Sequence, residues 1–229
     1  MWGRGGTDRD EHERGIALAL LSFTAGSMDA IAFLTLGEVF TSAMSGNTIL
    51  LGLALGQGRM SAASHSLAAF VGYVIGVAIA ALPLGISRHG VEWTLILECL
   101  ILAVFAGIWT SFGGPIDPTE VYALIILSAI AMGLQGAVGR AIGVPGVPTT
   151  VITSTLTAII GAITERVVAR DRPVLTVPTR QQIETFAAYL ASAAVIAFAV
   201  SRSPTALSYF PLAAVLALVL GLRLRFLHL

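Results

Sequence analysis

The sequence predicts an all-α protein, a polytopic helical membrane bundle of six to eight membrane segments. Three observations predict this fold class. Of the 229 residues, 56% are hydrophobic and only 11% are charged, whereas a soluble globular domain carries about 25% charged residues. The apolar residues gather into runs close to the roughly 20 residues that a spanning helix needs. The 24 glycines suit helices that approach one another closely in lipid.

The composition also excludes several classes of function. A net charge of zero argues against a nucleic-acid-binding surface. Cys99 is the single cysteine, so an intrachain disulfide or a cysteine metal cluster is excluded. The four histidines, His12, His65, His89 and His228, form no metal-binding motif, and a chain without Lys has no Walker motif. We therefore expect no enzyme activity, cofactor or metal. The expected partners are the lipid bilayer and an unidentified small solute. Whether the chain also forms a homo-oligomer stays open.

The segments follow a polar, Gly-rich stretch, residues 1–14, which we expect to be a disordered cytoplasmic tail. Eight apolar runs come after it, and the second, at 17 residues, is at the lower limit for crossing a membrane. In chain order the runs are Gly15–Leu36, Thr41–Gln57, Ala62–Ile86, Glu92–Phe112, Glu120–Ile142, Thr149–Val168, Ile183–Val200 and Thr205–Leu222.

Local signals support individual runs. The third contains Gly72-x-x-x-Gly76, a spacing typical of closely packed membrane helices. Trp93 and Trp109 lie near the two ends of the fourth run, where interfacial aromatic residues belong. The Gly- and Pro-rich loop 113–118 then divides the chain into a first membrane repeat, 15–112, and a second, 119–229.

The two halves share one order: a long run, a Gly-containing break, a short Ser/Thr-rich run and two more long runs. Aligning Gly52 with Gly161 places Ser45 on Ser154 and Thr41 on Thr150. With two residues inserted in the break, Asp29 falls on Gly136 and Phe33 on Arg140. This pattern favours an internal duplication, as in many transporters.

Two topologies remain open. If both short runs cross the membrane, there are eight spans and parallel repeats; if both are re-entrant, there are six spans and inverted repeats. With the N-terminus in the cytoplasm and Arg140 set aside, either arrangement puts 10 of the other 12 Arg inside. The positive-inside rule thus predicts a cytoplasmic N-terminus and does not choose between the two.

Two charged residues inside apolar runs are candidates for a solute or ion pathway. Asp29 lies about midway along the first run, where an unpaired charge is costly. It is interpreted either as a coupling or substrate-binding carboxylate, or as an acid neutralised by protonation or by Arg140. Arg140 itself could hold an anionic substrate or mark a helix end by reaching the headgroups. Glu98, near the start of the fourth run, is a secondary candidate that could instead face the interface.

The polar cluster Met44, Ser45, Gly46, Asn47 and Thr48 opens the second run. At a helix N-terminus such residues cap free amides and leave the positive end of the helix dipole facing a site. Ser, Thr and Asn also hold packed membrane helices together, which is the alternative interpretation.

The corresponding stretch of the second half includes Thr153 and Ser154 but has no Asn or Gly in the matching cluster. We expect the polar side chains Asp29, Ser45, Asn47, Thr48, Arg140, Thr153 and Ser154 to line one mid-membrane site together with Gly46.

The run from Gly26 to Gly52 resembles the YoaK-like family of small bacterial inner-membrane proteins, whose signature is a DA…F…F…MTGN run. Ser45 replaces the usual Thr of that signature. The matching residues are Asp29, Ala30, Phe33, Phe40, Met44, Gly46 and Asn47. The resemblance implies a multi-pass protein of the bacterial inner membrane with about six spans, and it implies no substrate. The function that the sequence favours is a small secondary transporter or channel-like carrier. The alternative is a non-transporting scaffold or modulator of a partner complex.

Overall fold

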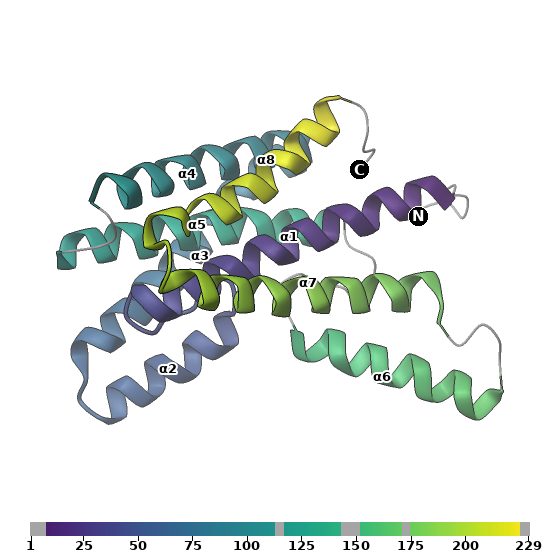
Figure 1. Ribbon diagram of the computed structural model, residues 1–229, viewed down its shortest axis with the longest axis horizontal. Coiled ribbons are helices and arrows are strands. Elements are labelled where there is room, and N and C mark those ends of the chain that lie inside the picture. The colour runs from purple at the N-terminus through teal and green to yellow at the C-terminus, as the bar shows by residue number, and fades with distance from the viewer. Residues whose placement is uncertain (1–7, 113–116, 143–151, 171–174, 225–229) are drawn as a thin grey trace.

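A computed structural model describes residues 8–112, 117–142, 152–170 and 175–224, and within these ranges the chain is a bundle of eight α-helices with one short 3₁₀ turn (Figure 1). The elements are α1 (Asp8–Thr35), α2 (Met44–Gly56), α3 (Met60–Ile86), α4 (Gly90–Phe112), α5 (Pro118–Ile142), α6 (Ile152–Ala169), α7 (Val177–Val200), η1 (Pro204–Ala206) and α8 (Tyr209–Arg223).

Six of the described helices are long and apolar enough to cross a membrane. They are α1, α3, α4, α5, α7 and the stretch formed by η1 and α8. Their outer faces carry exposed Leu, Ile, Val and Phe side chains, as expected for surfaces in contact with lipid. The all-α membrane class that the composition predicts is therefore confirmed.

Contacts between helices fix the directions in which they run. In the α1–α7 pair, Gln181 lies against the start of α1 and Tyr189 against its later part, so α1 and α7 are parallel. In the α4–α8 pair, Trp109 Nε1 donates to the Pro204 carbonyl at one end and Arg223 pairs with Glu92 at the other.

The α4–α8 pair is therefore antiparallel, and this orientation bears on the number of crossings. Eight crossings would make α4 and α8 parallel, because three further spans, α5, α6 and α7, would lie between them. The six candidate spans instead alternate in direction along the chain, as in a six-span path. Figure 1 shows the same alternation, with α5 beginning at the end of the bundle where α1 stops.

Close backbone contacts hold the tightest pairs together. On α3, a Cβ at Gly76 would overlap the Ile130 carbonyl of α5, and on α5 a Cβ at Gly133 would overlap the Tyr73 carbonyl of α3. On α1, a Cβ at Gly26 would overlap the Tyr189 carbonyl of α7 in the same way. Small residues allow this approach, and dispersion contacts between the backbones stabilise it where no hydrophobic effect acts.

The observed bounds correct several expected ones. Residues 8–14, expected as part of the disordered tail, form the first turns of α1, because these turns dock on α7 through the Gln181 amide and the Glu11 carbonyl. α7 begins at Val177, six residues before the expected Ile183, with Thr176 as its N-cap. Residues 1–7, the loop at 113–116, and Thr149 and Thr150 lie outside the described residues.

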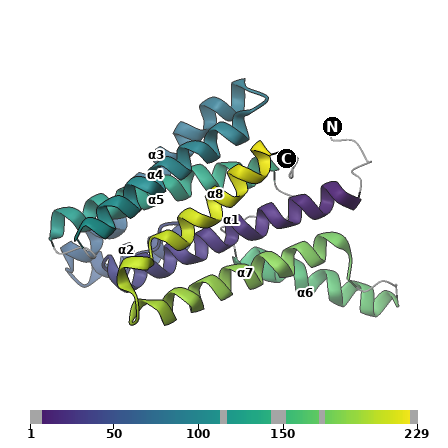
Figure 2. The same ribbon diagram turned by 45° about the horizontal axis from the view of Figure 1, so that its top comes forward.

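Figure 2 shows that α6 lies beside α7, at the edge of the bundle. α2 packs on α3 in the same way. Neither short helix therefore joins the central layer of long helices, in which α1, α5, α3 and α7 are in contact.

Replacing Gly133 by Ala is expected to lower the free energy of unfolding by about 1–3 kcal/mol, since the added methyl group would overpack the α3–α5 contact. The measurement is the thermal unfolding midpoint in detergent, together with size-exclusion monodispersity. Gly161→Ala is the matched control, because a Cβ on that glycine of α6 meets no atom within 4 Å. Equal midpoints for both variants would contradict the packing described above.

Candidate functional site

The segment between α1 and α2 turns back toward the interior of the bundle. Gly37 has a φ of +92° and Glu38 a φ of 60°, so two successive residues lie in the left-handed region that favours glycine. A side chain at Gly37 would also overlap the ring of His65 on α3. The chain therefore reverses at this glycine, and the residues that follow return along α1.

The returning segment wraps around the carboxylate of Asp29. Asp29 Oδ1 accepts hydrogen bonds from the backbone N–H groups of Thr41 and Ser42, each at 2.7 Å. Oδ2 accepts from Ser42 Oγ and from the Tyr189 hydroxyl, each at 2.6 Å. Asp29 is only 3% exposed, and Thr41 and Ser42 are buried with it. We call Asp29, Thr41, Ser42 and Tyr189 the carboxylate clasp.

The clasp lies at the depth of the centre of α7. Tyr189 is the thirteenth residue of a helix that contains 24. A carboxylate at that depth is costly unless donors replace its water. Hydrogen bonds to a charged group are the strong kind, and four of them at these lengths supply that replacement. The clasp therefore joins α1, the returning segment and α7 at one point.

Asn47 holds the returning segment from its other side. Its Oδ1 accepts from the Phe40 N–H at 3.0 Å, and its Nδ2 donates to the Phe40 carbonyl at 2.6 Å. The Phe40 ring stacks on Phe33 of α1 at 5.2 Å between centroids and lies against Gly46. Phe40 lies outside any helix or strand, so its backbone N–H and carbonyl have no helical partners. The side-chain amide of Asn47 pairs with both of them.

α2 starts directly after the clasp. Its first amides carry the positive end of a helix dipole, and Asp29 accepts from the two N–H groups at Thr41 and Ser42, just ahead of the N-cap Ala43. The protein therefore places its own anion beside the N-terminus of this short helix. A helix start of this kind is a natural binding place for an anionic group.

The structure brings together only part of the predicted site. Asp29, Asn47 and Gly46 meet around the returning segment. Ser45 and Thr48 lie on the exposed face of α2, and Thr48 Oγ1 donates to the Met44 carbonyl of its own helix.

Residues predicted from the second half of the chain lie elsewhere. Thr153 and Ser154 lie on the exposed side of α6, near its start. Glu98 is buried in α4, away from the clasp.

Arg140 is exposed near the end of α5. It lies far along the bundle from Asp29, the residue with which the sequence pairs it. Gln135 Nε2 donates to the Leu21 carbonyl at 2.8 Å, which sets the level of α5 against α1. From that level, Arg140 lies five residues toward the start of α1 and Asp29 eight residues toward its end. At 1.5 Å per residue they are separated by about 20 Å along the helix axes. The charge of Asp29 is therefore balanced by the clasp donors and not by Arg140.

Sequence reasoning missed Tyr189 as a partner of Asp29. A signal was present: the pattern Phe186-x-x-Tyr189-x-x-Ser192 in α7 matches Phe70-x-x-Tyr73-x-x-Gly76 in α3. A polar hydroxyl in the middle of an apolar run, found twice at equivalent places, would have indicated a buried acceptor for each.

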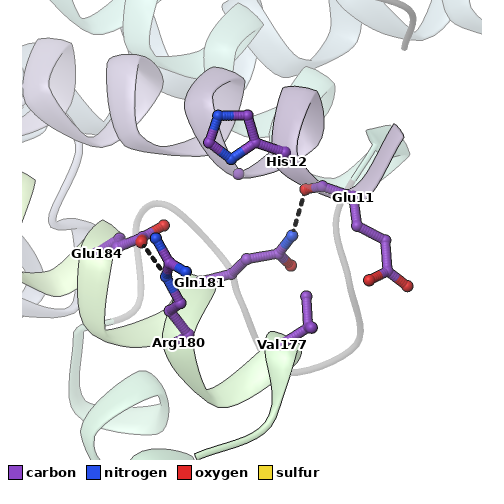
Figure 3. A pocket seen from close by; sticks show the side chains of 7 residues that line it. Glu11, His12, Val177, Arg180, Gln181 and Glu184 are labelled. Atoms are coloured by element: carbon purple, nitrogen blue, oxygen red, sulfur yellow. Dashed lines mark hydrogen bonds and ion pairs between the residues drawn. The ribbon is translucent and has the colours of Figure 1, made fainter. Parts of the chain in front are cut away.

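A second polar depression opens at the end of the bundle where α1 and α7 begin (Figure 3). Gln181 Nε2 donates to the Glu11 carbonyl at 2.6 Å across it, and Arg180 pairs with Glu184 on one side of α7 at 2.7 Å. The Arg180–Glu184 pair is solvent-exposed, where such pairs contribute little to stability. Within the described ranges, no three His, Cys, Asp or Glu side chains are grouped so as to hold a metal ion.

Comparison with known proteins gives a family without an assigned activity. The family model described as "Protein of unknown function (DUF1275)" matches residues 17–222. UPF0700 transmembrane protein YoaK of Bacillus subtilis (strain 168) is 40% identical over 158 residues, covering 67% of this chain and 68% of the relative. No solved structure matches the chain significantly. The resemblance found in the Gly26–Gly52 run is confirmed.

Tyr189→Phe should lower the free energy of unfolding by about 1.5–3 kcal/mol, because it removes one hydrogen bond to a buried charge. Asp29→Ala should cost more, since it leaves buried donors without an acceptor, and Asp29→Asn should lie between them. Thermal unfolding in detergent measures all three. Tyr209→Phe, at the half-exposed start of α8, is the control and should match the wild type. An Asp29→Ala variant as stable as the wild type would exclude the clasp.

Proposed function

We propose that this chain, which belongs to the DUF1275 family of proteins of unknown function, is a small secondary transporter for an unidentified small solute. The observation that supports this proposal most directly is that two short helices, α2 and α6, begin near the middle of the bundle and end toward its opposite ends (Figure 1). The carboxylate clasp lies at the start of one of them. The chain's place in a family of transmembrane proteins supports the membrane setting and leaves the solute open.

The depth of α2 follows from its hairpin with α3. α2 ends at Gly56 and α3 starts at Met60, with Arg59 N–H bonded to the Ala54 carbonyl in the turn. Counting back 12 residues along both helices puts Met44 opposite about residue 72, near the centre of α3. With 13 residues, α2 is about 20 Å long, which is too short to cross a hydrocarbon core of about 30 Å.

α6 packs on α7 in the way that α2 packs on α3. α6 and α7 run antiparallel in Figure 1, and both line one depression that contains Ala158, Arg166, Thr176 and Gln182. In the same view α6 starts near the middle of α7. Helices that start at mid-membrane, with their positive ends inward, are the usual place for a transporter's substrate or coupling ion.

Matched contacts support an inverted repeat that relates α1–α4 to α5–α8. α3 packs parallel to α5 as α7 packs parallel to α1, and α4 packs on α5 as α8 packs on α1. A parallel α3–α5 pair follows from the contact of His65 with Tyr122 near both helix starts and of Gly76 with Gly133 farther along. Exchanging the two halves therefore preserves these pairs and the α4–α8 contact, whereas the α3–α4 contact has no comparable α7–α8 counterpart among the described residues.

The repeat extends to individual residues. Gly26 meets the carbonyl of Tyr189, and Gly133 meets the carbonyl of Tyr73. Three residues further on, Asp29 accepts from the Tyr189 hydroxyl, and a Cβ on Gly136 would lie 2.5 Å from the Tyr73 hydroxyl. The pairing of Asp29 with Gly136 is the one that the sequence alignment predicts.

This arrangement suggests how a carrier would work. The clasp ties α2 to α1 and α7 through one buried carboxylate. A solute group that takes over the Thr41 and Ser42 N–H donors, or a proton that neutralises Asp29, would release the returning segment. Release at one short helix while the other stays packed would open the bundle toward one side of the membrane, which is the basis of alternating access.

The alternative is a non-transporting scaffold, and one observation favours it. Asp29 and Asn47 are buried and use their hydrogen-bonding groups within the protein, as purely structural polar residues do. In a scaffold, substitutions in the clasp would act only through folding. In a carrier, a folded clasp variant would show altered transport.

The six-span topology predicts that a cysteine at Arg59 reacts from outside the cell and a cysteine at Arg88 does not. The measurement is labelling of intact cells with a membrane-impermeant maleimide, for Arg59→Cys and Arg88→Cys in a Cys99→Ala background. An eight-span chain would give the reverse result, with Arg88→Cys labelled and Arg59→Cys protected, and the inverted repeat would then be wrong.

Transport itself is tested with purified protein in proteoliposomes on a solid-supported membrane. The probes are amino acids, carboxylates, organic amines, and sodium and potassium ions, each added alone. At least one class should give a current that protein-free liposomes lack and that Asp29→Asn abolishes, with Tyr209→Phe as the unaffected control. Absence of flux for every class, with folded protein in the membrane, would favour the scaffold.

A further inference from the structure

A second buried carboxyl lies in surroundings opposite to those of Asp29. Glu98 is in the third turn of α4, with 0% of its surface exposed. Neither of its carboxyl oxygens has a hydrogen-bond partner among the residues that the structure describes. It shares its face of α4 with the core residues Leu95, Leu102 and Phe105. Asp29 has four short hydrogen bonds, and Glu98 has none to any described residue.

The position of Glu98 is within the membrane-spanning part of the bundle. It lies between the two contacts that join α4 to the last span, Glu92 with Arg223 at one end and Trp109 with the Pro204 carbonyl at the other. Glu98 is six residues from Glu92, about 9 Å along the helix axis, so it cannot reach the interface as an exposed glutamate would.

The elements packed against α4 carry no charged side chain at this depth. α8 has none between Tyr209 and Arg223, α5 none between Tyr122 and Arg140, and α3 none between Tyr73 and Arg88. On α4 itself the titratable groups are Glu92, which is paired with Arg223, and Cys99, the neighbouring thiol. None of these elements therefore supplies a cation at this depth that would stabilise a carboxylate.

An ionised carboxylate without partners in an apolar interior is strongly disfavoured, and such a group takes up a proton instead. Neutral polar atoms are nevertheless buried in the same core. Ser22 Oγ and Gln135 Oε1 lack partners within the described part of the chain, while Gln135 Nε2 is anchored on the Leu21 carbonyl. A neutral carboxyl can be buried in the same way, without a counter-ion.

We propose that Glu98 is the proton-binding site of the carrier, so that the ion coupled to the solute is the proton. In the closed bundle the carboxyl carries its proton. When the packing of α4 on α8 or α5 opens to water, the O–H bond breaks, the proton passes to water, and the carboxylate is stabilised by hydration. Reprotonation from the other side allows the bundle to close again. The coupling role rests on the proposed transport function, whereas the protonated state of Glu98 does not.

The protonated state is tested first, without any solute. Infrared spectroscopy of the reconstituted full chain at neutral pH should show the C=O stretch of a protonated carboxyl, shifted by deuterium exchange. Glu98→Gln should lose this band, and Asp29→Asn should keep it. Because glutamine has the size and neutrality of the protonated acid, Glu98→Gln should also keep the wild-type unfolding midpoint. Persistence of the band in Glu98→Gln, or its absence from the wild type, would overturn the proposal.

The coupling role is tested on the solute class that gives a current, with a pH-sensitive dye inside the proteoliposomes. Glu98→Gln should lose solute-driven proton uptake but keep exchange of labelled solute across the membrane, and Glu98→Asp should restore proton uptake. Proton uptake by Glu98→Gln equal to the wild type would exclude coupling through this residue. If no class is transported while the infrared band behaves as expected, the transport function fails and the buried protonated carboxyl stands.

Discussion

The architecture depends on one constraint, the need to surround a carboxylate with donors in a place that water does not reach. The carboxylate of Asp29 satisfies this constraint by accepting hydrogen bonds from two backbone N–H groups and two hydroxyls. Backbone N–H donors are free only outside helices or in the first turn of a helix, so α1 must end and the following segment must turn back. The break at Gly37 and the late start of α2 at Met44 are consequences of that requirement.

The clasp also explains why the polar residues of the Gly26–Gly52 run are needed together. Asp29 fixes Thr41 and Ser42, while Asn47 fixes Phe40 just before them. Each residue satisfies polar backbone that would otherwise be unpaired inside an apolar bundle, where each unsatisfied group costs several kcal/mol. Of the signature residues, Asp29, Phe33, Phe40 and Asn47 thus stabilise one non-helical turn at membrane depth.

Two buried carboxyls with opposite surroundings give the proposed carrier a division of roles. Asp29 holds structure together through donors on three segments, and Glu98 lies among apolar side chains where the neutral form is favoured. Environment sets the behaviour of each acid, since the side chains differ by a single methylene group. In the proposed inverted repeat, the position equivalent to Asp29 is Gly136, so the second half has no carboxylate at that place.

The sequence by itself determined the membrane class, the approximate helices and the family, because hydrophobicity, helix length and a local motif are properties of short stretches. It also indicated the Asp29–Gly136 equivalence. The tertiary structure alone decided which residues meet. Tyr189 reaches Asp29 across 160 positions, Arg140 lies far from Asp29, and Ser45 and Thr48 face outward. The direction of α4 against α8 likewise depends on contacts between distant segments. Hydropathy does not predict these contacts, because apolar helices in lipid can pack in either orientation.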